Sequence, residues 1–203
     1  MSDKPEQRKP HRVEAERTVF TFAVLSESGW HALQDGTVRH EGSFYEWMTA
    51  NVFAAFSLEA YLNHLGPLRF KCWEELERLP IESKLALLLE DLNESPDFSS
   101  RPFQTVKDML RFRNQLAHGR SERVEETSFQ KLFPGERPRY PQTKWEAQCT
   151  KKIATRFIED AQAVIMQLHK WAELDATLLF SPGEGSAKSA RLEASGKPTG
   201  NVV

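Results

Sequence analysis

The sequence predicts an all-α protein: an antiparallel, four-to-five-helix bundle with disordered termini. Long stretches without glycine or proline carry apolar residues at helical spacing, no segment alternates convincingly between apolar and polar residues, and no internal repeat is present. With 203 residues, 39% of them hydrophobic, the chain is long enough for one domain to bury its own core.

The N-terminal part predicts an arm followed by a helix. Residues 1–12 combine alternating charges with Pro5 and Pro10, so we expect a disordered arm there. A single helical domain then covers residues 13–180, and a helix over residues 13–33 opens it, although residues 18–24 are also compatible with a strand.

The firmest prediction is a long central helix over residues 44–65. This segment has no glycine or proline, it follows Ser43 as a cap, and it ends at Gly66 and Pro67. Its helical wheel is apolar on nearly every side, so we expect protein all around it.

The remaining elements are shorter helices, an irregular connection and a last long helix. We expect helices over residues 71–79, 82–92 and 103–118, the third ending at a left-handed Gly119, and a further helix over residues 144–179 after a proline-rich connection. Residues 181–203 hold four of the ten glycines and no aromatic residue, which predicts a disordered tail.

The helix predicted over residues 103–118 places a cation on its apolar face. At roughly 100° per residue, Arg113 falls in the middle of the arc that the buried positions occupy. Because an unpaired buried guanidinium is costly, we expect a partner for it, and Glu59, which also lies in an apolar stretch, is the best candidate.

A polar stripe runs beside this arginine. Lys107, Arg111, Asn114 and His118 follow the i, i+4, i+7, i+11 ridge of the same helix. Asn114 precedes His118 by one turn and can orient its imidazole, and the last turn of a helix favours a protonated histidine.

The string from Arg113 to Gly119, RNQLAHG, resembles the signature of the HEPN-domain family, in which an arginine, usually followed by a polar residue, precedes a histidine by four to six residues. The preceding helix, with Ser57-Leu58-Glu59-Ala60 and Asn63, is similar to the first core helix of that family. The resemblance is strongest over residues 44–174.

This resemblance implies a bundle that dimerises so that two motif helices face one cleft. Many family members are metal-independent endoribonucleases with toxin-antitoxin or phage-defence roles. Carried onto this chain, His118 would be the general acid/base, Arg113 would bind the scissile phosphate, and Asn114 would orient His118 or the phosphate. Lys107, Arg111 and Arg120 would bind RNA phosphates, with Glu59 as a supporting residue.

The residues of the motif are also compatible with other roles. Arg113 and His118 are five residues apart, roughly 140° around a helix, so Arg111, which shares a face with His118, competes as the phosphate ligand. His118 is also compatible with a plain helix-terminal role. A non-catalytic HEPN module that binds nucleotide, RNA or a partner protein is the alternative function.

The resemblance implies RNA and a second copy of the chain as partners, with an antitoxin or nucleotidyltransferase-like protein as a further candidate. No metal site and no cofactor are expected, because the histidines lack ligand spacing and no carboxylate cluster for magnesium is evident. The charged first residues and the lack of a segment of roughly 20 apolar residues predict a cytoplasmic protein without membrane contact.

Overall fold

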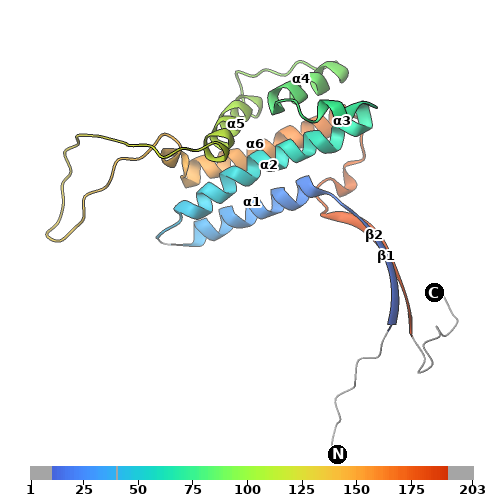
Figure 1. Ribbon diagram of the computed structural model, residues 1–203, viewed down its shortest axis with the longest axis horizontal. Coiled ribbons are helices and arrows are strands. Elements are labelled where there is room, and N and C mark those ends of the chain that lie inside the picture. The colour runs from blue at the N-terminus through green and yellow to red at the C-terminus, as the bar shows by residue number, and fades with distance from the viewer. Residues whose placement is uncertain (1–10, 40, 192–203) are drawn as a thin grey trace, which may run out of the picture.

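The computed structural model describes residues 11–39 and 41–191, and this part of the chain is mostly helical (Figure 1). Its elements are, in order, β1 (His11–Val19), α1 (Thr21–Val38), α2 (Phe44–Arg69), α3 (Trp73–Leu76), α4 (Ile81–Asp91), α5 (Phe103–Ala117), η1 (Glu146–Gln148), α6 (Lys151–Trp171), η2 (Ala176–Leu178) and β2 (Gly183–Arg191). The predicted helical bundle is therefore present in outline, with a small sheet added to it.

The four long helices alternate in direction along the chain. α2 runs back along α1 (Figure 1), since Gly36 of α1 lies against Trp47 while the earlier Gly29 lies against Phe53. α2 and α6 run in the same direction. Near the start of each helix, Asn51 of α2 bonds to Gln148, which directly precedes α6, and further along, Tyr61 of α2 bonds to His169, near the end of α6. α5 runs opposite to α6, since Phe103 stacks on Trp171 at one end of the pair while Phe112 meets Phe157 further along.

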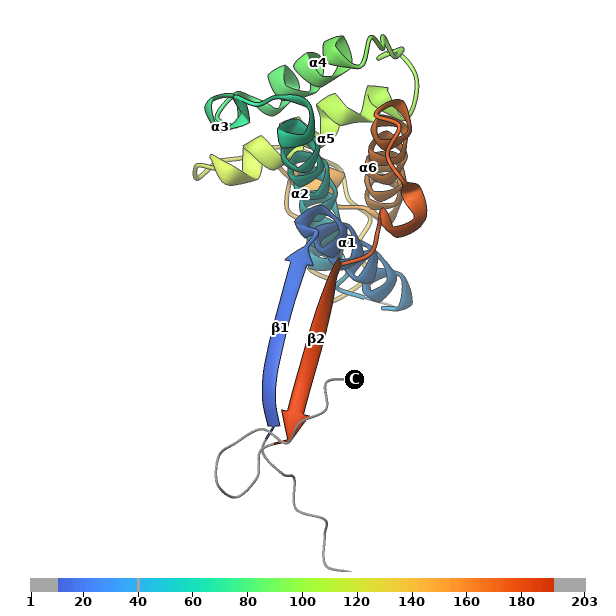
Figure 2. The ribbon, with the colours of Figure 1, turned by 90° about the vertical axis from the view of Figure 1, so that its right-hand side faces the viewer.

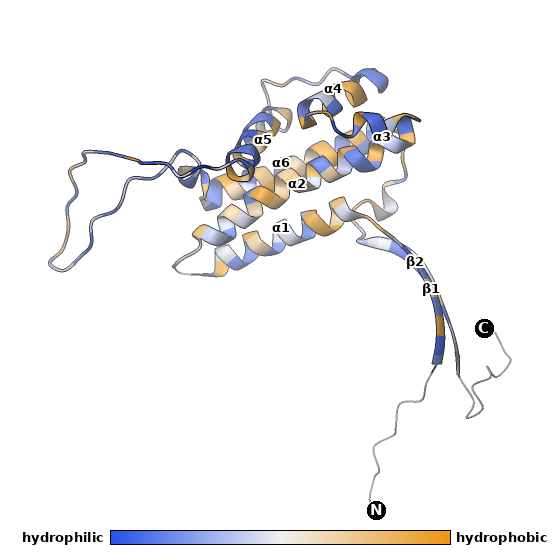
Figure 3. Ribbon diagram, viewed as in Figure 1, coloured by the Kyte–Doolittle hydropathy of each residue, from blue (hydrophilic) through white to orange (hydrophobic). Residues whose placement is uncertain are grey.

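Helix α2 lies at the centre of the bundle, in contact with α1, α3, α4, α5 and α6. Its fully buried residues lie along one broad face and include Ala54, Leu58, Tyr61, Leu62 and Leu65. On its other sides, no residue from Glu46 to Gly66 is exposed. The prediction that protein surrounds this helix is confirmed. Hydrophobic residues gather in the helices, whereas the 119–145 connection and the strands are mostly hydrophilic (Figure 3).

Helix α2 continues one turn beyond its predicted end, to Arg69. The Trp73 ring packs against the position of Gly66 so closely that a Cβ there would lie 2.1 Å from it. Gly66 therefore leaves room for the tryptophan ring, and the helix continues through Pro67, although this residue has no N–H to donate to Asn63 O.

Helix α5 is fixed to α6 by a buried carboxylate as well as by apolar packing. Asp160 is 4% exposed and accepts hydrogen bonds from Thr105 Oγ1 and from Arg101 Nε, the latter at 2.9 Å to Oδ2. Arg156 of α6 and Asp108 of α5 form a second ion pair at 3.2 Å. These contacts set the position of the helix that carries the predicted motif.

The all-α prediction is wrong at both ends of the described chain. β1 and β2 form an antiparallel two-stranded ribbon, with His11 opposite Arg191 and Val19 opposite Gly183 (Figure 2). The predicted helix over residues 13–33 therefore begins at Thr21, and the part of the predicted tail up to residue 191 is a strand rather than disordered. Residues 1–10 of the predicted arm and 192–203 of the predicted tail lie outside the described residues.

The ribbon escaped prediction because it buries no apolar face. Every β1 residue is exposed, so backbone hydrogen bonds rather than side-chain packing hold the pair. Gly183, at φ +147°, brings its backbone against Thr18 so closely that no side chain fits there. The glycines of residues 181–203 predict disorder when the sequence is considered alone. In the structure, Gly183 instead permits the close approach of the two strands.

Three other helix boundaries differ from prediction. α3 is a single turn, α6 runs from Lys151 to Trp171 rather than over residues 144–179, and α5 ends at Ala117 without a left-handed glycine after it. His118 caps α5 instead, and its backbone N–H donates to Asn114 O at 3.0 Å. Among the described helices, none combines the length and apolar character that a membrane crossing requires.

Candidate functional site

The C-terminal half of α5 presents a polar face beside its buried one. Val106, Met109, Leu110 and Phe112 are at most 3% exposed and hold the helix to the core. The residues between them stay at the surface, because the helical period turns positions 107, 111, 114 and 118 to one side. This is the predicted polar stripe.

An open cavity of about 600 Å³ lies over this stripe. Its lining comes from α5, from the residues directly after it and from the start of α4, and comprises Glu82, Lys107, Arg111, Asn114, Gln115, His118, Gly119, Arg120 and Glu122. The structure thus brings together five of the residues that the sequence singled out: Lys107, Arg111, Asn114, His118 and Arg120.

The cavity wall carries cations that are free to meet a ligand. Within the described residues, Lys107 and Arg120 have no carboxylate within 4.0 Å, and Arg111 reaches only Asp108, at 3.5 Å. Three positively charged side chains around one cavity attract anions such as phosphate. The carboxylates of Glu82 and Glu122 also line the cavity and reduce its net positive charge.

His118 lines the cavity from the C-cap of α5. The residue is exposed, and in the part of the chain that the structure describes its imidazole makes no hydrogen bond. An imidazole in that position can exchange protons with a ligand in the cavity.

Arg113 points elsewhere, towards α2. Its Nη2 donates to Glu59 Oε2 at 3.0 Å, both side chains are 24% exposed, and its guanidinium lies 5.7 Å from the centre of the Phe56 ring. The ion pair with Glu59 expected from the sequence is present. Arg113 does not line the cavity that contains His118.

Asn114 connects the two environments. Its Oδ1 accepts a hydrogen bond from Arg113 Nη1 at 3.0 Å, and its side chain lines the cavity together with His118. The expectation that Asn114 orients the imidazole directly is not what this geometry shows, because the amide oxygen is engaged by Arg113. Its amide nitrogen makes no hydrogen bond within the described chain.

Three lining residues were not found from the sequence: Glu82, Gln115 and Glu122. Gln115 Oε1 is buried and has no hydrogen-bond partner among the described residues, so it can accept one from a ligand. Gln115 lies inside the motif string and could have been noticed there. Glu82 comes from α4, and no sequence spacing links it to α5.

The described residues contain no group of three or more histidine, cysteine, aspartate or glutamate side chains arranged to hold a metal ion. Buried polar clusters elsewhere have structural roles. In one of them, His169 Nδ1 and the Tyr61 hydroxyl are 3.0 Å apart inside the core, and His64 lies against the same tyrosine. Burial, and then the nearby His169, lower the pKa of His64 below its ordinary value of 6.5.

Comparisons of the chain with models of known protein families, with curated proteins and with solved structures found no match. The candidate site is therefore defined by its own geometry: an open cavity lined by cations, by the amides of Asn114 and Gln115 and by an exposed histidine.

Proposed function

We propose that the protein is a metal-independent endoribonuclease of the HEPN type, with a toxin-antitoxin or phage-defence role. The observation that carries the proposal is the convergence of Lys107, Arg111, Asn114 and His118 on one open cavity, at the end of the helix whose sequence resembles the HEPN motif. RNA contains its own nucleophile, so cleavage needs a proton acceptor near neutral pH and fixed positive charge near the phosphate.

The reaction that fits this site is transfer of the phosphodiester to the neighbouring ribose oxygen. His118 takes the proton of the 2'-OH, and that oxygen attacks the adjacent phosphorus. The bond from phosphorus to the 5' oxygen breaks, which leaves a 2',3'-cyclic phosphate on one fragment and a 5'-hydroxyl on the other. In a homodimer with facing motif helices, the partner subunit's His118 protonates the departing oxygen.

The cations of the cavity wall bind the phosphates in this proposal. Arg111 lies on the same face as His118 and stabilises the charge that develops at phosphorus, while Lys107 and Arg120 hold the neighbouring phosphates. Arg113 acts as a positioning residue through its bond to Asn114. The role of direct phosphate ligand that the resemblance implies for Arg113 thus passes to Arg111.

The test is cleavage of single-stranded RNA in the presence of EDTA by the purified full chain. We expect cyclic-phosphate ends, no cleavage by His118→Ala, and unchanged thermal unfolding of that variant because the side chain is exposed. His31→Ala is the matched control, since His31 is an exposed helical histidine whose contact is with Glu27. A wild-type protein inert on single-stranded, structured and total cellular RNA contradicts the proposal.

The second candidate function is a non-catalytic HEPN module that binds RNA, nucleotide or a partner protein. The Arg113–Glu59 ion pair favours it, because this pair gives the motif arginine a structural role. It predicts that His118→Ala leaves both binding and cellular phenotype unchanged, whereas Arg113→Ala destabilises the fold. The cleavage assay with His118→Ala separates the two functions.

A further inference from the structure

The connection between α5 and α6 exposes a group of aromatic side chains. Phe129, Phe133 and Tyr140 are 104%, 82% and 89% exposed, and all lie within residues 129–140, which we call the arm tip. Single exposed apolar residues are ordinary on protein surfaces, but three large rings within one projecting segment indicate a surface that a partner covers.

The arm tip has a defined local structure that presents these rings. Arg139 N donates to Gln130 Oε1 at 2.8 Å, and Gln130 Nε2 donates to Arg139 O at 2.9 Å, so the two sides of the tip are joined. At the far end, Phe133 N donates to Glu136 Oε2 at 2.9 Å and closes the turn. The connection projects from the end of α5 away from the bundle (Figure 1).

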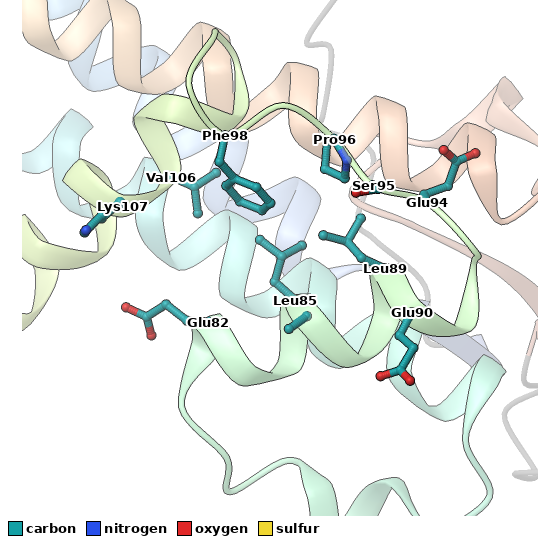
Figure 4. A pocket seen from close by; sticks show the side chains of 11 residues that line it. Glu82, Leu85, Leu89, Glu90, Glu94, Ser95, Pro96, Phe98, Val106 and Lys107 are labelled. Atoms are coloured by element: carbon teal, nitrogen blue, oxygen red, sulfur yellow. The ribbon is translucent and has the colours of Figure 1, made fainter.

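A second feature of the same chain is complementary to the arm tip. Between α4 and the start of α5 lies an apolar cavity of about 580 Å³, which we call the α4–α5 groove. Leu85 and Leu89 of α4 face Pro96, Phe98 and Val106 across it (Figure 4). A groove of this size and character accepts bulky apolar side chains.

The charges around the groove and on the arm tip are opposite. The groove is lined by three carboxylates and one ammonium group, on Glu82, Glu90, Glu94 and Lys107. The arm tip carries three cations and one carboxylate, on Lys131, Arg137, Arg139 and Glu136. An excess of two negative charges therefore meets an excess of two positive ones, which favours association and fixes its orientation.

We infer that the arm tip of one protein molecule docks in the α4–α5 groove of a second copy, and that the exchange is reciprocal. An aromatic side chain buries about 150–250 Å², so the six rings of two arms bury about 900–1,500 Å². A stable specific interface buries about 1,200–2,000 Å² in total, and the groove surface adds the remainder. The arm points away from α4 of its own chain (Figure 1), so it can reach only the groove of another molecule, and the opposite charges of the arm tip and the groove select a second copy as that molecule.

The docked arm reaches the edge of the candidate site. Glu82 and Lys107 line both the α4–α5 groove and the cavity that contains His118. The partner subunit's arm would then lie beside the cavity that binds RNA in the proposed function, with the cations of the arm near that cavity. This inference rests on the homodimer in the proposed function and not on the cleavage reaction, so its test needs no RNA.

The first experiment measures the mass of the full chain by light scattering and by sedimentation at several concentrations. We expect a dimer for the wild type and a monomer for the double variant Phe129→Ser, Phe133→Ser. Tyr45→Ser is the matched control, because Tyr45 is a 69% exposed aromatic residue on α2, outside the arm and the groove. Circular dichroism and thermal unfolding are expected to be the same in all three proteins.

The second experiment exchanges the charges. One variant carries Lys131→Glu, Arg137→Glu and Arg139→Glu in the arm tip, and another carries Glu90→Lys and Glu94→Lys in the groove. Each variant is expected to be monomeric alone because like charges then face each other, and an equimolar mixture is expected to form a heterodimer in which both contacts are restored.

Three results overturn the inference. The first is a wild-type protein that is monomeric at every concentration. The second is a dimer that survives the loss of Phe129 and Phe133, or charge variants that do not associate on mixing. The third is a monomer whose arm variants lose only RNA binding, which would assign the aromatic rings to base stacking. The first result would also remove the partner subunit's His118 from the proposed reaction, whereas the second and third leave the cleavage assay as the separate test of that reaction.

Discussion

Removal of the Glu59 carboxylate provides the sharpest test of how α5 is fixed to α2. Glu59→Ala deletes the partner of Arg113 and leaves a guanidinium that is 24% exposed and whose buried Nε already lacks a hydrogen bond within the described chain. Because the charge remains while its partner is gone, we expect the folded state to be destabilised and the polar face of α5 to loosen.

The size of the effect follows from the burial of the pair. Exposed ion pairs contribute about 0.2–1 kcal/mol, and removal of one partner from a fully buried pair costs about 3–5 kcal/mol. With 24% exposure on both sides, the pair lies between these limits, and we expect a loss of about 2 kcal/mol. For a domain of this length that corresponds to a fall in Tm of about 4–8 °C.

The assay is urea unfolding of four proteins: the wild type, Glu59→Ala, Arg113→Ala and the double variant. We expect Arg113→Ala to cost more than Glu59→Ala, since it also removes the bond to Asn114 and the contact with Phe56. The coupling energy between the two sites should be about 1–2 kcal/mol. Additive losses, with coupling below about 0.3 kcal/mol, would refute the reasoning, because the pair would then contribute nothing beyond its separate side chains.

Three further outcomes are expected. Lys107→Ala and Arg111→Ala should each weaken RNA binding and lower the salt slope of log Kd by about one, measured by fluorescence anisotropy, and an unchanged slope would remove that residue from the phosphate path. Burial raises the pKa of the Cys149 thiol to about 12, so a thiol reagent at pH 8 should modify the exposed Cys72 quickly and Cys149 only after unfolding. Rapid modification of both thiols in the folded protein would contradict the buried position of Cys149. Burial lowers the folded-state pKa of His64, so the neutral imidazole contributes to stability above pH 6.5, and this contribution is lost as the pH falls below that value. His64→Phe should therefore flatten the acidic part of a profile of unfolding free energy, measured with urea, against pH. A profile identical to that of the wild type would contradict this role of His64.

Prediction from the sequence was most successful where the signal is local. The start of α2 at Phe44 and that of α5 at Phe103 follow from uninterrupted apolar periodicity. The partner of Arg113 was also predictable, because a guanidinium and a carboxylate that interrupt two apolar stretches satisfy each other at the least cost. The polar stripe on α5 is likewise a consequence of the helical period alone.

The relation between Arg113 and His118 was not predictable in the same way. Spacing placed the two residues roughly 140° apart on one helix, but the neighbours on each side decided what each one faces. α2 supplied Glu59 for the arginine, while α4 supplied Glu82 for the wall of the cavity at His118. A helical wheel contains no information on which other element will lie against it.

The sequence by itself determined the helices, the apolar faces that join them and the charged positions on α5, because each of these depends on residues within a few turns of one another. Only the tertiary structure decided the ribbon and the two cavities. β1 and β2 lie at opposite ends of the chain and pair through backbone hydrogen bonds, which leave no mark in side-chain pattern. The cavities lie between α4 and α5, and their shape depends on how these helices approach each other in the folded protein.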